Sequence, residues 1–303
     1  MAYKRLSAVQ TGVVLNSTFN CRSDELETIC LNEKRNLCVP PLRAFDSKFR
    51  TAKKFKIGTC VIEKSMSTIM AAITCLLHDH QAFLSANRTV SNDLYENRFC
   101  KDKNEYKSLR QLLQENSLNE SNPGWLFLAA IRDPIDRFLS GYVDKCIKEQ
   151  KRKSSPGRCY GCGTKNLTCF VERLYTRAMR YANGDTRLQS YEDIHLFPQN
   201  WHCNFNSFFS KFTFLRFVPP QSPAYGQMLE TLADILAEQE VPAGVTHQVV
   251  AQLRESQTAH STLQSTERWQ VGQLLRENKN LMKKLIQLFY YDFVLFGFEF
   301  PQI

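Results

Sequence analysis

Two short clusters of cationic and hydroxyl side chains each follow an apolar stretch of the sequence. Residues 64–68, which read Lys-Ser-Met-Ser-Thr, separate an apolar stretch at 57–62 from an apolar helical pattern at 68–78. A lysine, three hydroxyls and the unpaired N–H groups of a helix start are groups that bind phosphate-like anions. The alternative is that a serine or threonine only caps the helix. The glycines of the loop G-x-x-x-x-G-K-[ST] are missing, which disfavours a nucleoside-triphosphatase.

The second cluster, residues 132–142, reads R-D-P-I-D-R-F-L-S-G-Y and follows the apolar run 125–131. Arg132 stands at the end of this run, and Ser140 lies about two turns into the helix predicted at 135–147. Open α/β sheets bind their ligands at the carboxyl ends of strands, and an arginine fork matches phosphate oxygens. The alternative is an ordinary strand–helix junction whose arginines pair with Asp133 and Asp136.

The elements that position these clusters alternate between strands and helices. Strands are predicted at 57–62, 125–131 and 212–217, and helices at 68–78, 135–147 and 168–181, with helical character at 105–115 and 245–288. An unalternating apolar run such as 125–131 suits a strand buried on both faces of a parallel sheet. The pattern predicts an α/β fold, an open sheet with helices on both faces. Residues 1–55 are predicted to form a cysteine-bearing extension, and 56–303 the main domain.

Composition and charge narrow the class of protein. The 303 residues are 43% hydrophobic and carry 39 Lys+Arg against 30 Asp+Glu, a net charge of +9. This composition excludes a disordered chain and indicates an acidic partner. No apolar stretch approaches the ~20 residues that cross a bilayer, so membrane attachment would need a segment that this sequence does not contain.

Cysteines and glycosylation sequons together indicate an oxidising compartment. There are 11 cysteines, and N-x-[ST] sequons occur at Asn16, Asn87, Asn119 and Asn166. Both features favour the lumen of the secretory pathway, and an odd number leaves at least one thiol unpaired in a monomer. One loop holds Cys146, Cys159, Cys162 and Cys169. Disulfides that tether this loop are favoured over a zinc site, because the spacings are not those of a common zinc ribbon.

The two clusters resemble those of the carbohydrate sulfotransferases that use 3′-phosphoadenosine 5′-phosphosulfate (PAPS). In that family a Lys/Ser/Thr turn after the first strand holds the 5′-phosphosulfate, and R-D-P-x-x-R-x-x-S-x-Y holds the 3′-phosphate. The residues that match are Lys64, Ser65, Ser67 and Thr68 in the first motif, and Arg132 and Ser140 in the second. Residues 291–298 resemble the C-terminal Y-x-D-F-x-x-F-G-Y segment of the family.

The resemblance implies a P-loop-like open parallel sheet flanked by helices, and sulfuryl transfer from PAPS to a carbohydrate hydroxyl. The branch that is most similar contains chondroitin 4-O-sulfotransferases, whose middle segment matches at His195, Pro198, Gln199 and Cys203. It implies an anionic polysaccharide such as chondroitin as partner rather than nucleic acid, and a place in the Golgi lumen. A basic run, Lys148, Lys151, Arg152 and Lys153, could line an acceptor groove or be a solvated face.

Sulfuryl transfer asks a protein to position its substrates and to neutralise the charge that develops on the leaving oxygen. By the resemblance, Lys64 stabilises the bridging oxygen, and Arg132 with Ser140 selects the 3′-phosphate. His195 is the candidate general base, with a packed structural histidine as its alternative, and Glu63 is the rival base. No metal is expected, because side chains supply the positive charge. Rival interpretations are a P-loop kinase, a basic binding protein without catalysis for glycosaminoglycan or nucleic acid, and an inactive family member.

Overall fold

The computed structural model describes residues 29–32, 35–118, 124–152, 157–164, 166–187, 189–255 and 265–303. The described chain divides into two compact units. The first comprises residues 45–132 and 203–255, and the second comprises 29–44, 133–202 and 265–303. The sequons at Asn16 and Asn119, together with Cys21 and Lys153, lie outside the described residues.

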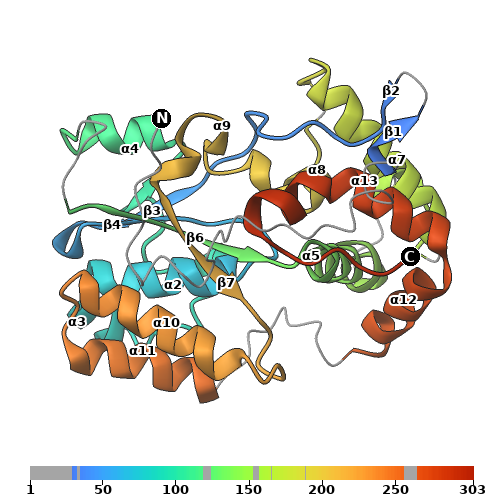
Figure 1. Ribbon diagram of the computed structural model, residues 1–303. Coiled ribbons are helices and arrows are strands. Elements are labelled where there is room, and N and C mark those ends of the chain that lie inside the picture. Colours follow the sequence, from blue (N-terminus) through green and yellow to red (C-terminus); the bar gives the residue numbers. More distant parts are fainter. Residues whose placement is uncertain are drawn as a thin grey trace. The chain divides into compact units, whose positions relative to one another are not determined.

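The first unit is built on a five-stranded sheet in the order β5-β3-β4-β6-β7 (Figure 1). Three strands, β4 (Ile57–Cys60), β6 (Leu126–Arg132) and β7 (Phe212–Phe217), are parallel, as the apolar runs predict. The α/β fold class is therefore confirmed. Parallel pairing puts the carboxyl ends of β4 and β6 at the same edge, and each of the two chemical clusters follows one of these ends.

Two further strands, β3 (Phe49–Ala52) and β5 (Glu105–Tyr106), extend the sheet in the antiparallel sense. Both are departures from the prediction. The helical segment expected at 105–115 begins with β5, and its helix α4 is confined to Leu109–Glu115. The strand β3 lies before residue 55, within the predicted extension, and the domain boundary placed there stays a prediction.

Helices cover both faces of this sheet. On one face lie α2 (Ser67–His78), α3 (His80–Ser85), α10 (Tyr225–Glu238) and α11 (Ala243–Glu255), as Figure 1 shows. Their apolar side chains form one core with alternate residues of the parallel strands, such as Leu128 and Leu215. The intervening strand residues point to the other face, toward α4 and α9 (Phe205–Phe208), because side chains alternate along a strand. There Phe127 and Phe205 pack on Phe212.

The second unit is mainly helical. The helix predicted at 135–147 begins at Pro134 as α5 (Pro134–Tyr142) and then widens into a π-helix, Val143–Lys148, before α6 (Glu149–Arg152). The remaining elements are a short hairpin, β1 (Leu31–Asn32) and β2 (Arg35–Asn36), and the helices α7 (Leu167–Ala182), α8 (Tyr191–Leu196), α12 (Thr266–Glu277) and α13 (Lys279–Phe296).

Five disulfides join the ten cysteines that the structure describes: Cys30–Cys38, Cys60–Cys203, Cys75–Cys100, Cys146–Cys159 and Cys162–Cys169. The last two tether the loop after α5, so the disulfide prediction for that loop is confirmed. Its four sulfurs are bonded in pairs, which removes the thiolates that a zinc site would need. Five disulfides fit a protein of the secretory pathway.

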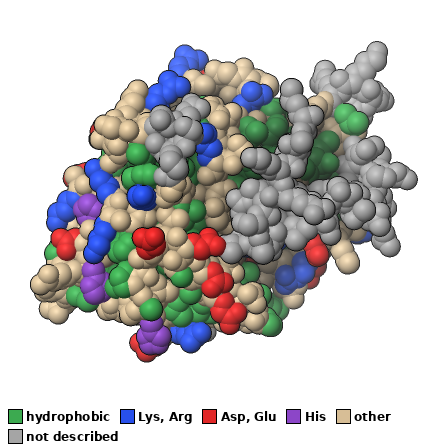
Figure 2. Space-filling model, turned by 60° about the vertical axis from the view of Figure 1, so that its left-hand side comes forward, with side chains coloured by type: hydrophobic (Ala, Val, Ile, Leu, Met, Phe, Trp, Pro, Cys, Tyr) green, Lys and Arg blue, Asp and Glu red, His purple; other side chains and the backbone are tan. Residues whose placement is uncertain are grey.

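The surface carries charges of both signs. On the face in Figure 2, Lys and Arg side chains lie among other side chains over the upper part and along the left edge, and acidic side chains gather lower down. The described residues of this face therefore form no continuous basic surface. Across the part of the chain that the structure describes, no helix is both long and apolar enough to cross a membrane.

Candidate active site

The turn between β4 and α2 carries the first cluster. Lys64 and Met66 have positive φ angles of 66° and 63°, so the backbone passes twice through the left-handed region. Met66 is the N-cap of α2, and among the described residues no side chain caps the helix. The alternative that a serine or threonine merely caps α2 is therefore wrong. The first N–H groups of a 12-residue helix are left for another acceptor, which is the arrangement that binds anions.

The hydroxyl of Ser65 is the most informative atom of this turn. The residue is fully buried at 0% exposure, and its Oγ makes no hydrogen bond to any residue that the structure describes. Its backbone N–H is used locally and donates to the carbonyl of Ile62 over 3.1 Å. A buried hydroxyl without a partner is costly, and a bound water, ion or ligand group is one way in which a native protein satisfies it. Ser67 and Thr68 follow as half-buried residues at the start of α2.

Arg132, the first residue of the second cluster, contacts this turn. It is the last residue of β6, it is 5% exposed, and its Nη1 donates to the backbone carbonyl of Lys64 over 2.9 Å. Its guanidinium also lies 5.0 Å from the ring centre of Phe217, its register partner on β7. The side chain is therefore fixed against the Lys64 turn, on the side of the sheet where the parallel strands end.

Glu63, beside Lys64, belongs to a buried ion cluster that the sequence did not indicate. The ammonium of Lys48 contacts the Glu63 carboxylate and also lies 3.0 Å from Asp46 Oδ2. Burial raises the pKa of Glu63, and Lys48 partly opposes that rise. A carboxyl group whose pKa is raised toward neutrality is better matched to general-base catalysis than an ordinary one. Lys48 lies 15 positions before Glu63 in a polar stretch, so no local spacing could have predicted the pair.

In the second unit, the residues at the start of α5 are suited to the N-terminus of a helix. Asp133 caps the helix by accepting from the N–H of Asp136 over 2.8 Å, and Pro134 occupies its first turn. Asp136 also pairs with Arg268 of α12. Arg137 is 1% exposed and donates to the carbonyl of Phe197 over 2.7 Å, so it supports the segment after α8.

Helix α5 packs closely on α8 beside Ser140. Ser140 is 7% exposed, and its neighbour Gly141 faces α8 without a side chain. A Cβ built on Gly141 would lie 2.6 Å from Leu196 Cδ2 and 3.4 Å from the carbonyl oxygen of His195. The glycine of the second motif therefore permits the close approach of the helix that carries the candidate base.

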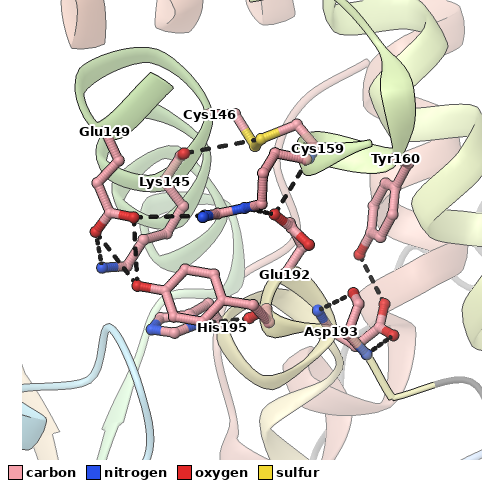
Figure 3. Close-up of polar contacts among 11 residues, drawn as sticks. Lys145, Cys146, Glu149, Cys159, Tyr160, Glu192, Asp193 and His195 are labelled. Carbon is pink, nitrogen blue, oxygen red and sulfur yellow. Dashed lines mark hydrogen bonds and ion pairs between the residues drawn. A yellow bond between two sulfur atoms is a disulfide. The ribbon is translucent and has the colours of Figure 1, made fainter. Parts of the chain in front are cut away.

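His195 lies in a network of polar contacts (Figure 3). Its Nδ1 lies 2.7 Å from the carbonyl oxygen of Tyr191, and the two rings are 4.4 Å apart. A carbonyl only accepts, so Nδ1 carries the proton and Nε2 is the basic nitrogen. The same short helix is tied to the disulfide-bonded loop, because Glu192 accepts from Arg158 and Asp193 accepts from Tyr160 over 2.8 Å. The α8 backbone that carries His195 is thus held on several sides.

Asp292, in the C-terminal segment, fixes the chain that follows α8. It is fully buried and accepts three hydrogen bonds: from the N–H of Gln199 over 2.9 Å, and from the N–H and Nδ2 of Asn200 over 2.8 Å and 2.6 Å. The sequence showed the motif that contains Asp292 but gave no sign of this role, since the partners are more than 90 positions away. Gln199 acts here through its backbone.

The fold and the turn at the strand ends gather groups that are suited to an anionic ligand where β4 and β6 end. A model of the sulfotransferase family matches residues 47–299. The chain is 35% identical over 259 residues to "Putative sulfotransferase vep-2" of Caenorhabditis elegans, which covers 85% of this chain and 79% of the relative. It is 32% identical over 263 residues to "Carbohydrate sulfotransferase chst-1" of the same organism, covering 86% and 78%.

The chain therefore belongs to the sulfotransferase family. This family generally uses PAPS as sulfate donor, and membership makes sulfuryl transfer the class of activity. No solved structure matches the chain.

Proposed function

We propose that this protein transfers the sulfuryl group of PAPS to a carbohydrate hydroxyl, with position 4 of N-acetylgalactosamine in chondroitin as the acceptor implied by the sequence resemblance. The observation that carries the nucleotide half is the buried, unpartnered hydroxyl of Ser65 in an uncapped turn beside Lys64 and Arg132. The name of the chst-1 relative supports a carbohydrate acceptor. The disulfides and the resemblance support a place in the Golgi lumen.

Each group at the turn has a role in this proposal. The helix N–H groups, Ser65 and the hydroxyls of Ser67 and Thr68 hold the phosphosulfate end of the donor. Lys64 places its ammonium at the bridging oxygen, where negative charge develops as the sulfur–oxygen bond breaks. The sequence resemblance assigns the 3′-phosphate to Arg132 and Ser140. The charge is neutralised by side chains and the helix dipole.

The general base remains a choice between two residues. Glu63 adjoins Lys64, and burial raises the pKa of its carboxyl, which makes its carboxylate a stronger proton acceptor than an ordinary one. His195 holds its tautomer through Tyr191, which leaves Nε2 as the nitrogen that accepts a proton. The two assignments differ in a testable way. The fall of the rate at acid pH should disappear on replacement of Glu63 if Glu63 is the base, and on replacement of His195 if His195 is the base.

Calorimetry with 3′,5′-ADP, 5′-AMP and ATP tests the nucleotide half. We expect 3′,5′-ADP to bind at least about 10-fold more tightly than 5′-AMP, because a phosphate paired with arginine contributes about 1.5–3 kcal/mol. Lys64→Ala should slow transfer of radiolabelled sulfate with little change in 3′,5′-ADP affinity. Equal affinity for the three nucleotides, together with steep salt dependence, would favour a basic binding protein without catalysis.

A further inference from the structure

A cavity of about 300 Å³ opens in the first unit beside β3 and β5. Its walls combine two tyrosines, Tyr95 and Tyr106, with cationic and acidic side chains. This volume lies at the lower end of the range of ligand sites, enough for one sugar unit of a longer chain. The turn between β4 and α2 does not line this cavity, so the nucleotide proposal leaves the cavity unexplained.

The cavity walls hold more positive than negative side chains. The cations are Lys48, Arg50, Arg98 and Lys107, and the carboxylates are Asp102 and Glu105. A single carboxylate, Glu105, serves two guanidinium groups. It lies 3.0 Å from Nε of Arg50, and it accepts from Arg98 over 2.5 Å and 2.8 Å.

Arg50 is the most deeply buried of these four cations. Its side chain is 5% exposed, and its Nη1 donates to the carbonyl of Phe49 over 2.8 Å. Its Nε lies within ion-pair distance of Glu105 but makes no hydrogen bond to any described residue. Burial lowers the pKa of this guanidinium, because its charge is only partly compensated. Lys107 at the exposed rim has no carboxylate partner among the described residues. An anion inside the cavity would compensate both charges.

The cavity is joined to the turn through one side chain. Lys48 lines the cavity and also contacts Glu63, which directly precedes Lys64. All of these residues belong to the first unit. A molecule bound in the cavity would therefore lie one side chain away from the carboxyl group that is a candidate base.

We infer that this cavity is an acceptor subsite that binds one uronic acid unit, whose carboxylate pairs with Arg50 and Lys107. Tyr95 and Tyr106 provide ring faces and hydroxyls for the sugar ring. Lys48 links this unit to the site of transfer. The inference rests on the proposed function, because it names where that function places its acidic acceptor.

The experiment measures saccharide binding to the full chain by calorimetry, with and without saturating 3′,5′-ADP. The probes are an unsulfated chondroitin tetrasaccharide and the same tetrasaccharide with its carboxyl groups reduced to alcohols. The test variant is Lys107→Glu. The matched control is Lys101→Glu, an exposed lysine in the same segment that does not line the cavity. A second variant, Arg50→Met, is used after circular dichroism confirms that it folds.

We expect the wild type to bind the acidic tetrasaccharide about 10-fold or more tightly than its reduced form. Lys107→Glu should weaken acidic binding about 10-fold, leave 3′,5′-ADP affinity within about 2-fold, and abolish the preference for the acidic probe. Arg50→Met should weaken acidic binding further. Lys101→Glu should resemble the wild type.

Three results would overturn the inference: equal binding of the two probes to the wild type, equal losses in Lys107→Glu and Lys101→Glu, or no saccharide binding at all. Each is separate from failure of the proposed function. If 3′,5′-ADP does not bind, the nucleotide proposal fails, and the titrations without nucleotide still decide the cavity. If 3′,5′-ADP binds and the saccharide results fail, only the subsite is lost.

Discussion

Replacing Asp292 by asparagine should change how the stability of the protein depends on pH. Asp292 is fully buried, and burial raises the pKa of its carboxyl from the ordinary 3.8 to about 6, against the opposing effects of Arg137 and three hydrogen-bond donors. That difference corresponds to about 3 kcal/mol. Since the native pKa is raised, this contribution to stability is complete below about pH 4 and is lost as the pH rises to about 6.

The asparagine variant keeps the shape of the side chain but cannot ionise. One of its two terminal atoms becomes a donor, which leaves a buried N–H of Gln199 or Asn200 facing another donor, at a cost of about 1–3 kcal/mol. The wild type should therefore exceed Asp292→Asn in free energy of unfolding most strongly at pH 4. By pH 7 this advantage should have shrunk by up to about 3 kcal/mol.

The assay is equilibrium unfolding in urea at several pH values from 4 to 7, followed by tryptophan fluorescence with the disulfides intact. Trp201 is fully buried, and its Nε1 donates to the carbonyl of Pro40 in the same unit, so it reports on the segment that Asp292 holds. The control is Asp234→Asn, which makes the same substitution at an exposed carboxyl on α10. A wild-type advantage that stays constant or grows from pH 4 to 7 would refute the reasoning. It would mean that the hydrogen-bond donors and Arg137 lower the pKa of Asp292 at least as much as burial raises it.

Three further outcomes are expected. If Glu63 is the base, kcat/KM should fall on the acid side of a pKa above the usual carboxyl range, since the base must be deprotonated, and Glu63→Gln should remove that limb in a pH–rate series. Gly141→Ala should destabilise the protein by about 1–2 kcal/mol in urea, because the new methyl group lies 2.6 Å from buried Leu196 Cδ2; in that background, Leu196→Ala should cost less than in the wild type. Replacing both cysteines of Cys60–Cys203 by serine should cost up to about 5 kcal/mol in the same assay, since the bridge closes 143 positions.

The parts of the fold that could be predicted are those with a strong local pattern. The apolar run at 125–131 and the helical pattern at 68–78 each lie within a single element. The bounds of β6 and α2 are therefore within a residue or two of the predicted ones. The strand β3 reads Phe-Arg-Thr-Ala, and all four residues are buried. Its Arg50 is buried because Glu105 of β5 lies beside it, and that pairing depends on the sheet rather than on the neighbouring sequence.

The residues of the candidate site can likewise be divided into those that the sequence could predict and those that it could not. Lys64, Ser65 and Arg132 could be named because they stand at the ends of predictable strands, where an open sheet binds its ligands. Lys48 and Asp292 could not, because each acts on a residue that only the fold brings near: Glu63 for Lys48, and the backbone of Gln199 for Asp292. Buried polar contacts between distant residues follow no periodic sequence pattern, so they cannot be predicted from one.

The contact between Arg132 and the Lys64 carbonyl changes how the two motifs must be interpreted. From the sequence, the two motifs are interpreted as separate binding sites for opposite ends of one nucleotide. Lys64 would then affect turnover, and Arg132 would independently affect nucleotide binding. In the structure the guanidinium holds the backbone of a turn that passes twice through the left-handed region, a conformation that costs energy for residues other than glycine. Loss of Arg132 therefore removes a support of the turn as well as any phosphate contact. Arg132→Lys, which keeps the charge but not the planar fork, should lower turnover in addition to 3′,5′-ADP affinity. An effect on affinity alone would show that the turn holds its shape without this contact.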